Sequence, residues 1–140
     1  MPKKATKQVQ TPQPDWLWRY RVTILRILDG DTVELLFDQG LGSASTQTCR
    51  LYGINTPELS KDGGRGSLET LEAMTGYRAC WARTIKNRSE SKAVQEKYGR
   101  YLVELYATSE AMDAGFPASI NQKMIDGGFA KPYFGVGASK

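Results

Sequence analysis

The sequence predicts a mainly β domain of the α+β class, a five-stranded oligonucleotide/oligosaccharide-binding barrel (OB-fold) with two short helices. Three observations lead to this prediction. Apolar and polar residues alternate in three successive stretches before residue 54, which indicates three strands. A helical pattern opens near Ser67, and two further strand-like stretches precede a capped helix at Ser119. A helix between the third and fourth of five strands is the order typical of this barrel.

The first half of the chain is expected to form three strands, at residues 16–28, 32–38 and 46–53. In the first of them the alternation slips, because Leu25 and Ile27 are apolar on the opposite parity from Val22 and Ile24. This slip indicates a β-bulge or strong coiling. The Asp-Gly dipeptide that follows the first strand is typical of a tight turn.

The second and third strands are expected to pair as an antiparallel hairpin around the Gly- and Ser-rich loop 39–45. Counting from a turn centred near residue 42 puts Asp31 opposite about residue 53 and Arg50 opposite about Glu34. The residues that would share the core face are Val33, Leu35, Cys49 and Leu51. Both ends of the stretch 29–58 therefore meet at one end of the hairpin.

The second half is expected to contain two helices separated by two strands. The expected elements are a helix from Ser67 to Gly76, strands at 77–87 and 100–107, and a helix that Ser119 and Gln122 open as a capping box and Gly127 ends. The charged segment 88–96 is expected to be mobile, and residues 129–140 hold too much glycine for regular structure.

The charge pattern divides the chain into a disordered basic tail at residues 1–15 and a single domain at 16–140. Residues 1–14 hold three lysines and no acid, which leaves 16 basic and 15 acidic residues in the remainder. The tail is either a solvated leader or a non-specific phosphate tether. Because the body is nearly neutral, attraction to nucleic acid would have to come from clustered charges.

The composition excludes several kinds of chemistry. The chain has no histidine, so histidine-based zinc sites and Ser-His or Cys-His catalysis are excluded. Two cysteines, Cys49 and Cys80, make no disulfide framework and are expected to be small buried residues. No apolar run is long enough to span a bilayer. We expect a cytoplasmic monomer with no membrane partner, unless a targeting segment is missing from this sequence.

Oxygen-bearing side chains gather at the predicted end of the hairpin. Asp29, Asp31, Asn55, Glu58 and the exposed backbone at Thr56 would all lie there. Such a set suits a hard divalent cation. Each residue taken singly also has a structural explanation, such as a turn aspartate, or a cross-strand pair between Arg50 and Glu34.

Several motifs in this order resemble those of the staphylococcal nuclease (thermonuclease) family. They are Asp-Gly-Asp-Thr-Val at 29–33, Arg-Leu-Tyr-Gly-Ile-Asn-Thr-Pro-Glu at 50–58, Lys-Tyr-Gly-Arg at 97–100, Ser-Ile-Asn at 119–121 and Gly-Gly-Phe-Ala at 127–130. The resemblance covers roughly residues 20–134. It implies calcium-dependent hydrolysis of DNA and RNA phosphodiesters with little sequence preference.

The resemblance also implies roles for individual residues. The catalytic residues would be Arg50, Glu58 and Arg100. The calcium ligands would be Asp31 and the Thr56 backbone carbonyl, with Asn55 at a ligand position and Asp29 behind them. Lys97 and Tyr98 would contact the nucleotide, and Tyr133 would stand in for a substrate-contacting tyrosine.

These roles agree with the chemistry of the side chains. Hydrolysis of a phosphodiester builds negative charge on the non-bridging oxygens, and arginine meets such oxygens in pairs without losing its proton. Calcium would polarise the phosphate and hold a water, and Glu58 would accept or orient that water's proton. Pro57 keeps Thr56 extended and so helps to fix where its carbonyl points.

The sequence departs from the family at Asn55, where the family usually has a second metal-ligating aspartate. The asparagine keeps an oxygen but removes a charge, so we expect weaker calcium binding rather than loss of activity. The leading hypothesis is a calcium-dependent nuclease that favours single-stranded or frayed nucleic acid. The alternatives are a catalytically silent OB-fold module that binds nucleic acid and, third, a protein-interaction domain.

Overall fold

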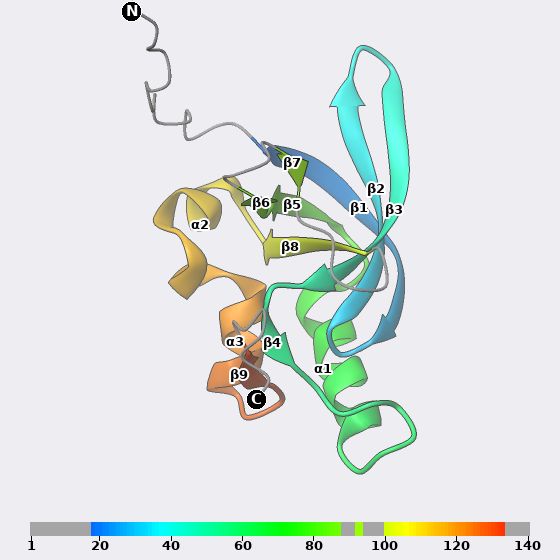
Figure 1. Cartoon of the computed structure of the whole chain (residues 1–140), viewed down its shortest axis with the longest axis vertical. Coiled ribbons are helices and arrows are strands. Elements are labelled where there is room, and N and C mark those ends of the chain that lie inside the picture. The colour runs from blue at the N-terminus through cyan, green and yellow to red at the C-terminus, as the bar shows by residue number, and fades with distance from the viewer. Residues whose placement is uncertain (1–17, 88–91, 94–99, 134–140) are drawn as a thin grey trace, which may run out of the picture.

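The computed structural model describes residues 18–87, 92–93 and 100–133 of the 140-residue chain (Figure 1). Its strands are β1 Arg19–Asp29, β2 Thr32–Gly40, β3 Ser43–Leu51, β4 Gly53–Asn55, β5 Ala79–Thr84, β6 Lys86–Asn87, β7 Lys92–Ala93, β8 Tyr101–Tyr106 and β9 Lys131–Tyr133. Its helices are α1 Gly64–Thr75, α2 Ser109–Ala114, the 3-10 helix η1 Phe116–Ala118 and α3 Ile120–Asp126. The predicted tail at 1–15 lies outside the described residues.

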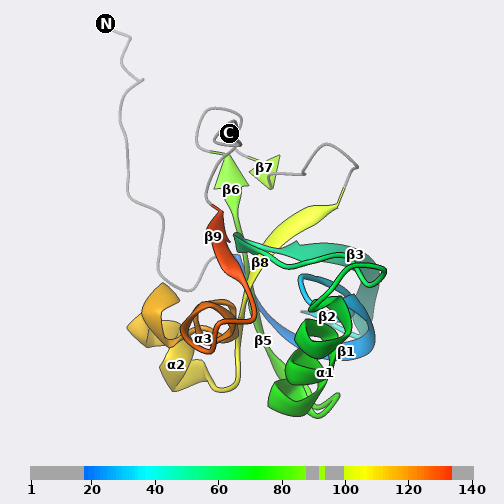
Figure 2. The same ribbon diagram turned by 90° about the horizontal axis from the view of Figure 1, so that it is seen from below.

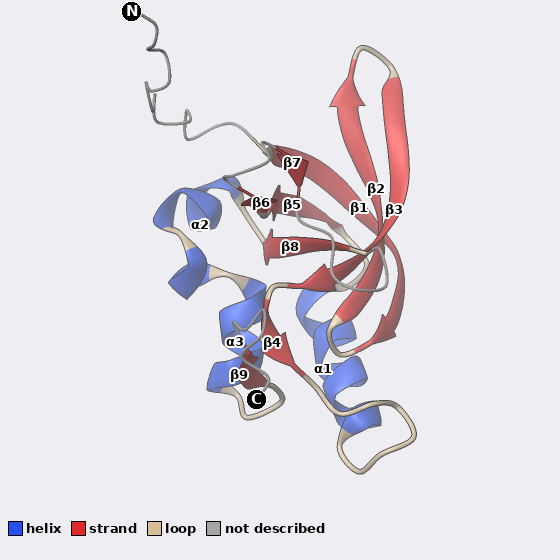
Figure 3. Cartoon of the chain, viewed as in Figure 1, coloured by secondary structure: helices blue, strands red, loops and turns tan. Residues whose placement is uncertain are grey.

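Five strands close into a barrel in the order β1-β2-β3-β8-β5, with β5 pairing back onto β1 (Figure 3). The pair β3–β8 is parallel and the other barrel pairs are antiparallel. Helix α1 lies in the chain between the third barrel strand, β3, and the fourth, β5. The predicted fold class is therefore confirmed as an OB-fold-like α+β barrel.

The barrel interior is filled by the alternate residues of its strands. The buried residues that the strands contribute include Val22, Ile24, Val33, Leu35, Cys49, Leu51, Ala82, Val103 and Leu105. Helix α1 packs against β1, and α3 packs against β4 and β8, so Leu71, Ile120 and Met124 extend the same core (Figure 2). Each buried Val, Leu, Ile or Met side chain contributes about 1.5–3 kcal/mol by leaving water, and this determines which face of each strand turns inward.

The β2–β3 hairpin confirms the predicted faces but corrects the predicted register. The strands run on to a two-residue turn at Leu41 and Gly42, and Thr32 rather than Glu34 pairs with Arg50. The centre of the hairpin lies near residue 41 rather than 42, so each residue pairs two positions away from its predicted partner. A two-residue shift leaves every side chain on its own face, because the period of a strand is two. The predicted core residues are therefore correct although the predicted register is wrong.

The slip in the first strand is a bulge. The pairing of β1 with β2 shifts register between Ile24 and Arg26, which leaves Leu25 unpaired and 42% exposed while Ile27 is buried. The extra residue lets apolar side chains of both parities reach the core in turn. The described part of this strand begins at Arg19.

The helices depart from the prediction in two places. Helix α1 begins at Gly64, after Gly63 in the left-handed conformation, so Ser67 lies inside the helix and does not cap it. Gly76 ends the helix as predicted, with φ of 60°. Helix α2 was not predicted at all, although Thr108 caps it by accepting a hydrogen bond from the Ala111 amide at 3.0 Å. The described residues thus hold three α-helices rather than two.

The predicted irregular tail at 129–140 contains a strand. Strand β9 pairs antiparallel with β4, so that Gly53 faces Tyr133 and Asn55 faces Lys131. Pro132 is compatible with this two-stranded sheet because its missing amide is tolerated at an edge. The pairing brings the C-terminal part of the described chain beside Asn55. Among the described residues, no helix is long and apolar enough to cross a membrane.

Candidate active site

Asp31 lies at the centre of a hydrogen-bonded network at one end of the barrel. Asp31 is 6% exposed, and its Oδ2 accepts a hydrogen bond from the Thr56 amide at 3.0 Å. Oδ1 accepts another from the Thr32 hydroxyl at 3.1 Å. The backbone carbonyl of Asp31 accepts the Leu51 amide at 2.8 Å, which joins the β1–β2 turn to the end of β3. The two ends of the stretch 29–58 therefore meet, as the sequence predicts.

Arg50 is fixed by the same network. Nη2 donates to Asn55 Oδ1 at 2.9 Å and lies 3.4 Å from Asp31 Oδ2. Nη1 donates to the Ile54 carbonyl at 2.9 Å and makes a longer contact of 3.5 Å with the Leu51 carbonyl. The side chain is 13% exposed, so its charge is largely removed from water. Such a guanidinium is held in one orientation by its five-donor fork.

Tyr133 covers this arginine. Its ring centroid is 5.6 Å from Arg50 Cζ, a distance typical of a cation–π contact. The pairing of β9 with β4 places the ring there. The sequence predicts that Tyr133 touches substrate, and the contact that the structure gives it is with the arginine.

Arg100 reaches the network through Thr32. Its Nη1 donates to the Thr32 hydroxyl at 3.1 Å, and that hydroxyl donates to Asp31. Arg50 therefore contacts one oxygen of the Asp31 carboxylate, and Arg100 reaches the other oxygen through Thr32. Lys97 and Tyr98, the predicted nucleotide contacts, lie outside the described residues.

Glu58 lies two residues beyond Thr56 on an exposed loop. Its carbonyl accepts the Lys61 amide at 2.9 Å, and its side chain has no hydrogen bond or ion pair with any other described residue. The loop closes directly onto the start of α1, because Gly64 has no side chain to obstruct the Glu58 carbonyl. No contact between described residues joins this side chain to Arg50 or Arg100. An exposed carboxylate of this kind can meet a water or a substrate.

Asp29 supports Asp31 from behind. Its Oδ1 accepts the Asp31 amide at 3.0 Å, which turns this carboxylate oxygen toward the backbone of the turn. Burial, the side-chain hydrogen bond with Asp31 and the negative charge of Asp31 together raise the pKa of Asp29 to about 6. That Asp29 lies behind the ligands of a metal ion stays a prediction.

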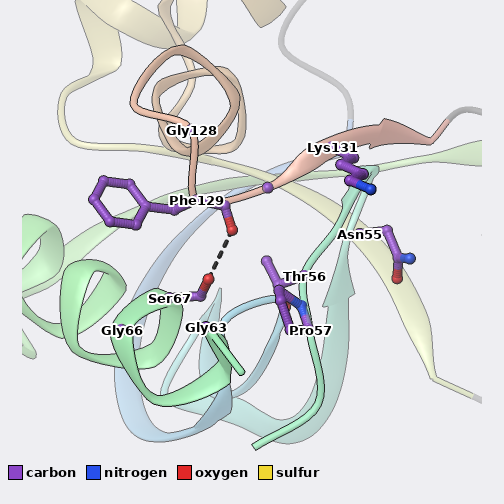
Figure 4. Close-up of a pocket in the computed structure, with 10 residues that line it drawn as sticks. Asn55, Thr56, Pro57, Gly63, Gly66, Ser67, Gly128, Phe129 and Lys131 are labelled. Carbon is purple, nitrogen blue, oxygen red and sulfur yellow. Dashed lines mark hydrogen bonds between the residues drawn. The ribbon is translucent and has the colours of Figure 1, made fainter. Parts of the chain in front are cut away.

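A cavity of about 380 Å³ opens beside the network (Figure 4). Its lining residues are Asn55, Thr56, Pro57, Gly63, Gly66, Ser67, Gly128, Phe129, Ala130 and Lys131. The Ser67 hydroxyl donates to the Phe129 carbonyl at 2.7 Å and so ties α1 to the turn before β9. The cavity shares Asn55 and Thr56 with the network, so a polymeric ligand lying along this end of the barrel would border both.

The oxygens of Asp31 and Asn55 converge on one point. A single cationic nitrogen, Arg50 Nη2, lies 3.4 Å from Asp31 Oδ2 and 2.9 Å from Asn55 Oδ1. A donor set of carboxylate, amide and backbone oxygens fits the preference of Ca²⁺. No three His, Cys, Asp or Glu side chains group together anywhere in the described ranges, and Asp31 is the carboxylate that meets Asn55 Oδ1 at this nitrogen. The donor chemistry therefore fits calcium with a low ligand charge.

Comparisons with known proteins add no assignment. No protein-family model matches the chain, and no curated protein shows significant similarity to it. The resemblance of its motifs to the staphylococcal nuclease family therefore remains an interpretation of the residues.

Two parts of the network were missed by the sequence reasoning. Thr32 bridges Arg100 to Asp31, and the Ile54 carbonyl anchors Arg50. The register places Thr32 opposite Arg50, whereas the Ile54 carbonyl belongs to β4. The Asp-Gly-Asp-Thr stretch contained the signal for Thr32, because a threonine directly after a turn aspartate can hydrogen-bond to it.

Proposed function

We propose that the protein is a calcium-dependent phosphodiesterase that hydrolyses DNA or RNA with little sequence preference. The observation that supports this most is the single network joining Arg50, Asp31 and Arg100 at one end of an OB-fold-like barrel. Two guanidinium groups flank one carboxylate, and the exposed Glu58 follows on the adjoining loop.

The arginines supply the charge that phosphodiester hydrolysis needs. Attack by water increases the negative charge on the non-bridging oxygens, and donors already held in place stabilise that charge without reorganising. Arg50 is held by the Ile54 carbonyl and by the Tyr133 ring, and Arg100 by Thr32. They would bind the phosphate from two sides.

Glu58 is the general base in this proposal. Its carboxylate is exposed and is not engaged by another described residue, so it is available to take a proton from an attacking water. A bound calcium ion would polarise the phosphate and lower the pKa of a water. Asp31, the Asn55 amide oxygen and the Thr56 backbone are the groups that would hold it.

Single strands are the favoured substrate class. OB-fold barrels typically bind single-stranded nucleic acid along a groove that follows the backbone. The near-neutral body also favours local phosphate contacts over long-range attraction.

A second function is favoured by one contact. Asn55 supplies an uncharged amide at the position where the resembling family usually has a carboxylate. Its Oδ1 already accepts a hydrogen bond from Arg50 at 2.9 Å. A chain in which this exchange prevents productive metal binding would be a nucleic-acid-binding barrel without hydrolysis.

A digestion assay separates the two. The protein is incubated with a single-stranded oligonucleotide and Ca²⁺, with and without a chelator, and binding is measured by fluorescence anisotropy. Cleavage that the chelator abolishes supports the nuclease. Binding without cleavage in any divalent cation replaces it with the silent barrel, and the loss of both leaves a protein-interaction domain.

A further inference from the structure

We infer that the guanidinium of Arg50 is a built-in competitor of the divalent cation, which must leave Asp31 and Asn55 before the cation can bind. This inference rests on the proposed calcium-dependent function. It concerns how the site is loaded, and it assigns Arg50 a second role beyond contact with phosphate.

The contacts of Nη2 carry the inference. This nitrogen contacts both side-chain oxygens proposed to hold the metal, at 2.9 Å for Asn55 Oδ1 and 3.4 Å for Asp31 Oδ2. The other two hydrogen bonds to the Asp31 carboxylate come from Thr56 and Thr32 within the protein. A cation that uses these oxygens therefore has to replace Nη2.

The charges at the site also support competition between Arg50 and the cation. Asp31 contributes one negative charge, Asn55 contributes none, and Arg50 returns one positive charge, so the donors and the arginine are neutral together. The Arg50 side chain is 13% exposed and that of Asp31 is 9% exposed, which limits how far water screens the pair. An aspartate at position 55 would leave an unneutralised charge for the metal, and the asparagine removes it.

The Arg50 guanidinium keeps two other contacts when Nη2 is released. Nη1 remains bonded to the Ile54 carbonyl at 2.9 Å, and the Tyr133 ring still covers the guanidinium. Rotation about this anchor frees Nη2 for another acceptor, and a phosphate oxygen is the acceptor that matches it. Binding of the cation would thus release the donor that binds the phosphate.

The test is calcium binding alone, by isothermal titration calorimetry without nucleic acid, on the wild type, Arg50→Met and Arg100→Met. Both variants remove one positive charge, but only Arg50 contacts the proposed ligands directly. We expect Arg50→Met to bind Ca²⁺ about tenfold more tightly than the wild type, and Arg100→Met about two- to threefold. Tighter calcium binding by Arg50→Met than by Arg100→Met supports competition. This comparison of the two variants holds even if the wild type binds calcium too weakly to measure.

Equal affinities in the two variants, or weaker binding in Arg50→Met, overturn the competition and leave the proposed function standing. Absence of calcium binding in all three proteins overturns both. A second measurement needs no variant: nuclear magnetic resonance follows rotation about the Nε–Cζ bond of Arg50 in the wild type. Saturating Ca²⁺ should speed that rotation while Arg83 on β5 stays unchanged, and an unaltered Arg50 contradicts the inference.

Discussion

Asp31 determines the arrangement of the site at the scale of single residues. It accepts hydrogen bonds from Thr32 and Thr56, and both arginines reach it directly or through Thr32. The sequence predicted that Asp31, Asn55 and Thr56 would meet, because a hairpin brings both its ends together. It could not predict the Arg50–Asn55 bond, because this contact joins β3 to β4 across an irregular turn and lies outside the hairpin whose pairs can be counted.

Asn55→Asp should lower the calcium concentration needed for cleavage by about tenfold. The carboxylate changes the local charge of Asp31, position 55 and Arg50 from neutral to one net negative, and a cation then binds more favourably. The measurement is the rate of oligonucleotide cleavage against calcium concentration. An unchanged calcium requirement would show that position 55 takes no part in metal binding.

Asp29→Asn should stabilise the protein at neutral pH and have little effect in acid. The pKa of Asp29 is raised to about 6 by burial and by Asp31, above its usual value of 3.8, so the folded state holds the proton more tightly. The free energy of unfolding of the wild type therefore falls as pH rises from about 4 to about 6. Asparagine keeps the oxygen that accepts the Asp31 amide.

Urea unfolding at about pH 4 and about pH 7.5 checks this prediction. We expect a gain of about 1 kcal/mol at the higher pH, because water screens a half-buried carboxylate, and nearly none at the lower pH. A gain of equal size at both pH values would contradict the assigned titration.

At the scale of elements, strand faces were predictable and helix starts were not. Val33, Leu35, Cys49 and Leu51 are all fully buried, because the apolar alternation is a local property of the chain. Ser67 looked like a helix cap by composition, yet its hydroxyl binds the Phe129 carbonyl 62 residues away. A contact of that range leaves no local signal.

Two glycines of α1 provide a matched test of how the helix positions Glu58. A Cβ at Gly64 would overlap the Glu58 carbonyl and lie 2.9 Å from Leu59 Cα, whereas a Cβ at Gly66 meets nothing within 4 Å. Gly64→Ala should destabilise the protein by about 1–3 kcal/mol and reduce cleavage, because the Glu58 loop must move. Gly66→Ala should stabilise it by about 0.5–1 kcal/mol through helix propensity.

Thermal unfolding and cleavage rates measure both glycine variants. Equal stability of the two would show that the loop does not depend on close contact with the start of α1.

Asn121 is the polar residue that joins the helical layer to the barrel. It is fully buried on α3, where its Nδ2 donates to the carbonyls of Tyr52 and Val103 at 2.8 and 3.1 Å. Its Oδ1 accepts the Leu105 amide at 2.9 Å. Asn121→Ala should cost about 3 kcal/mol, because it removes three hydrogen bonds from a buried side chain to the backbone at about 1 kcal/mol each.

Gln122→Ala on the same helix is the control for Asn121→Ala. Gln122 is only half buried and its side chain bonds Asp126, so the change should cost less than about 1 kcal/mol. Denaturant unfolding gives both values. Similar costs for the two variants would contradict the role assigned to Asn121.

At the scale of the whole molecule, the order of elements was enough to predict the barrel. Three strands, a helix and two strands close in the order β1-β2-β3-β8-β5. The short elements α2 and β9 were not predicted, because six and three residues are too few to show a periodic pattern. Strand β9 matters most for the site, because its pairing with β4 places Tyr133 over Arg50.

The measurement that tests the central claim most directly compares Glu58→Gln with Glu69→Gln, an exposed glutamate on α1 that has no contact with the network. Single-turnover cleavage of a single-stranded oligonucleotide in Ca²⁺ is measured for each, alongside oligonucleotide binding. If Glu58 is the general base, its variant should lose about 10²- to 10⁴-fold in rate and keep its binding, while Glu69→Gln behaves as the wild type. Equal cleavage by the two folded variants would contradict the proposed site.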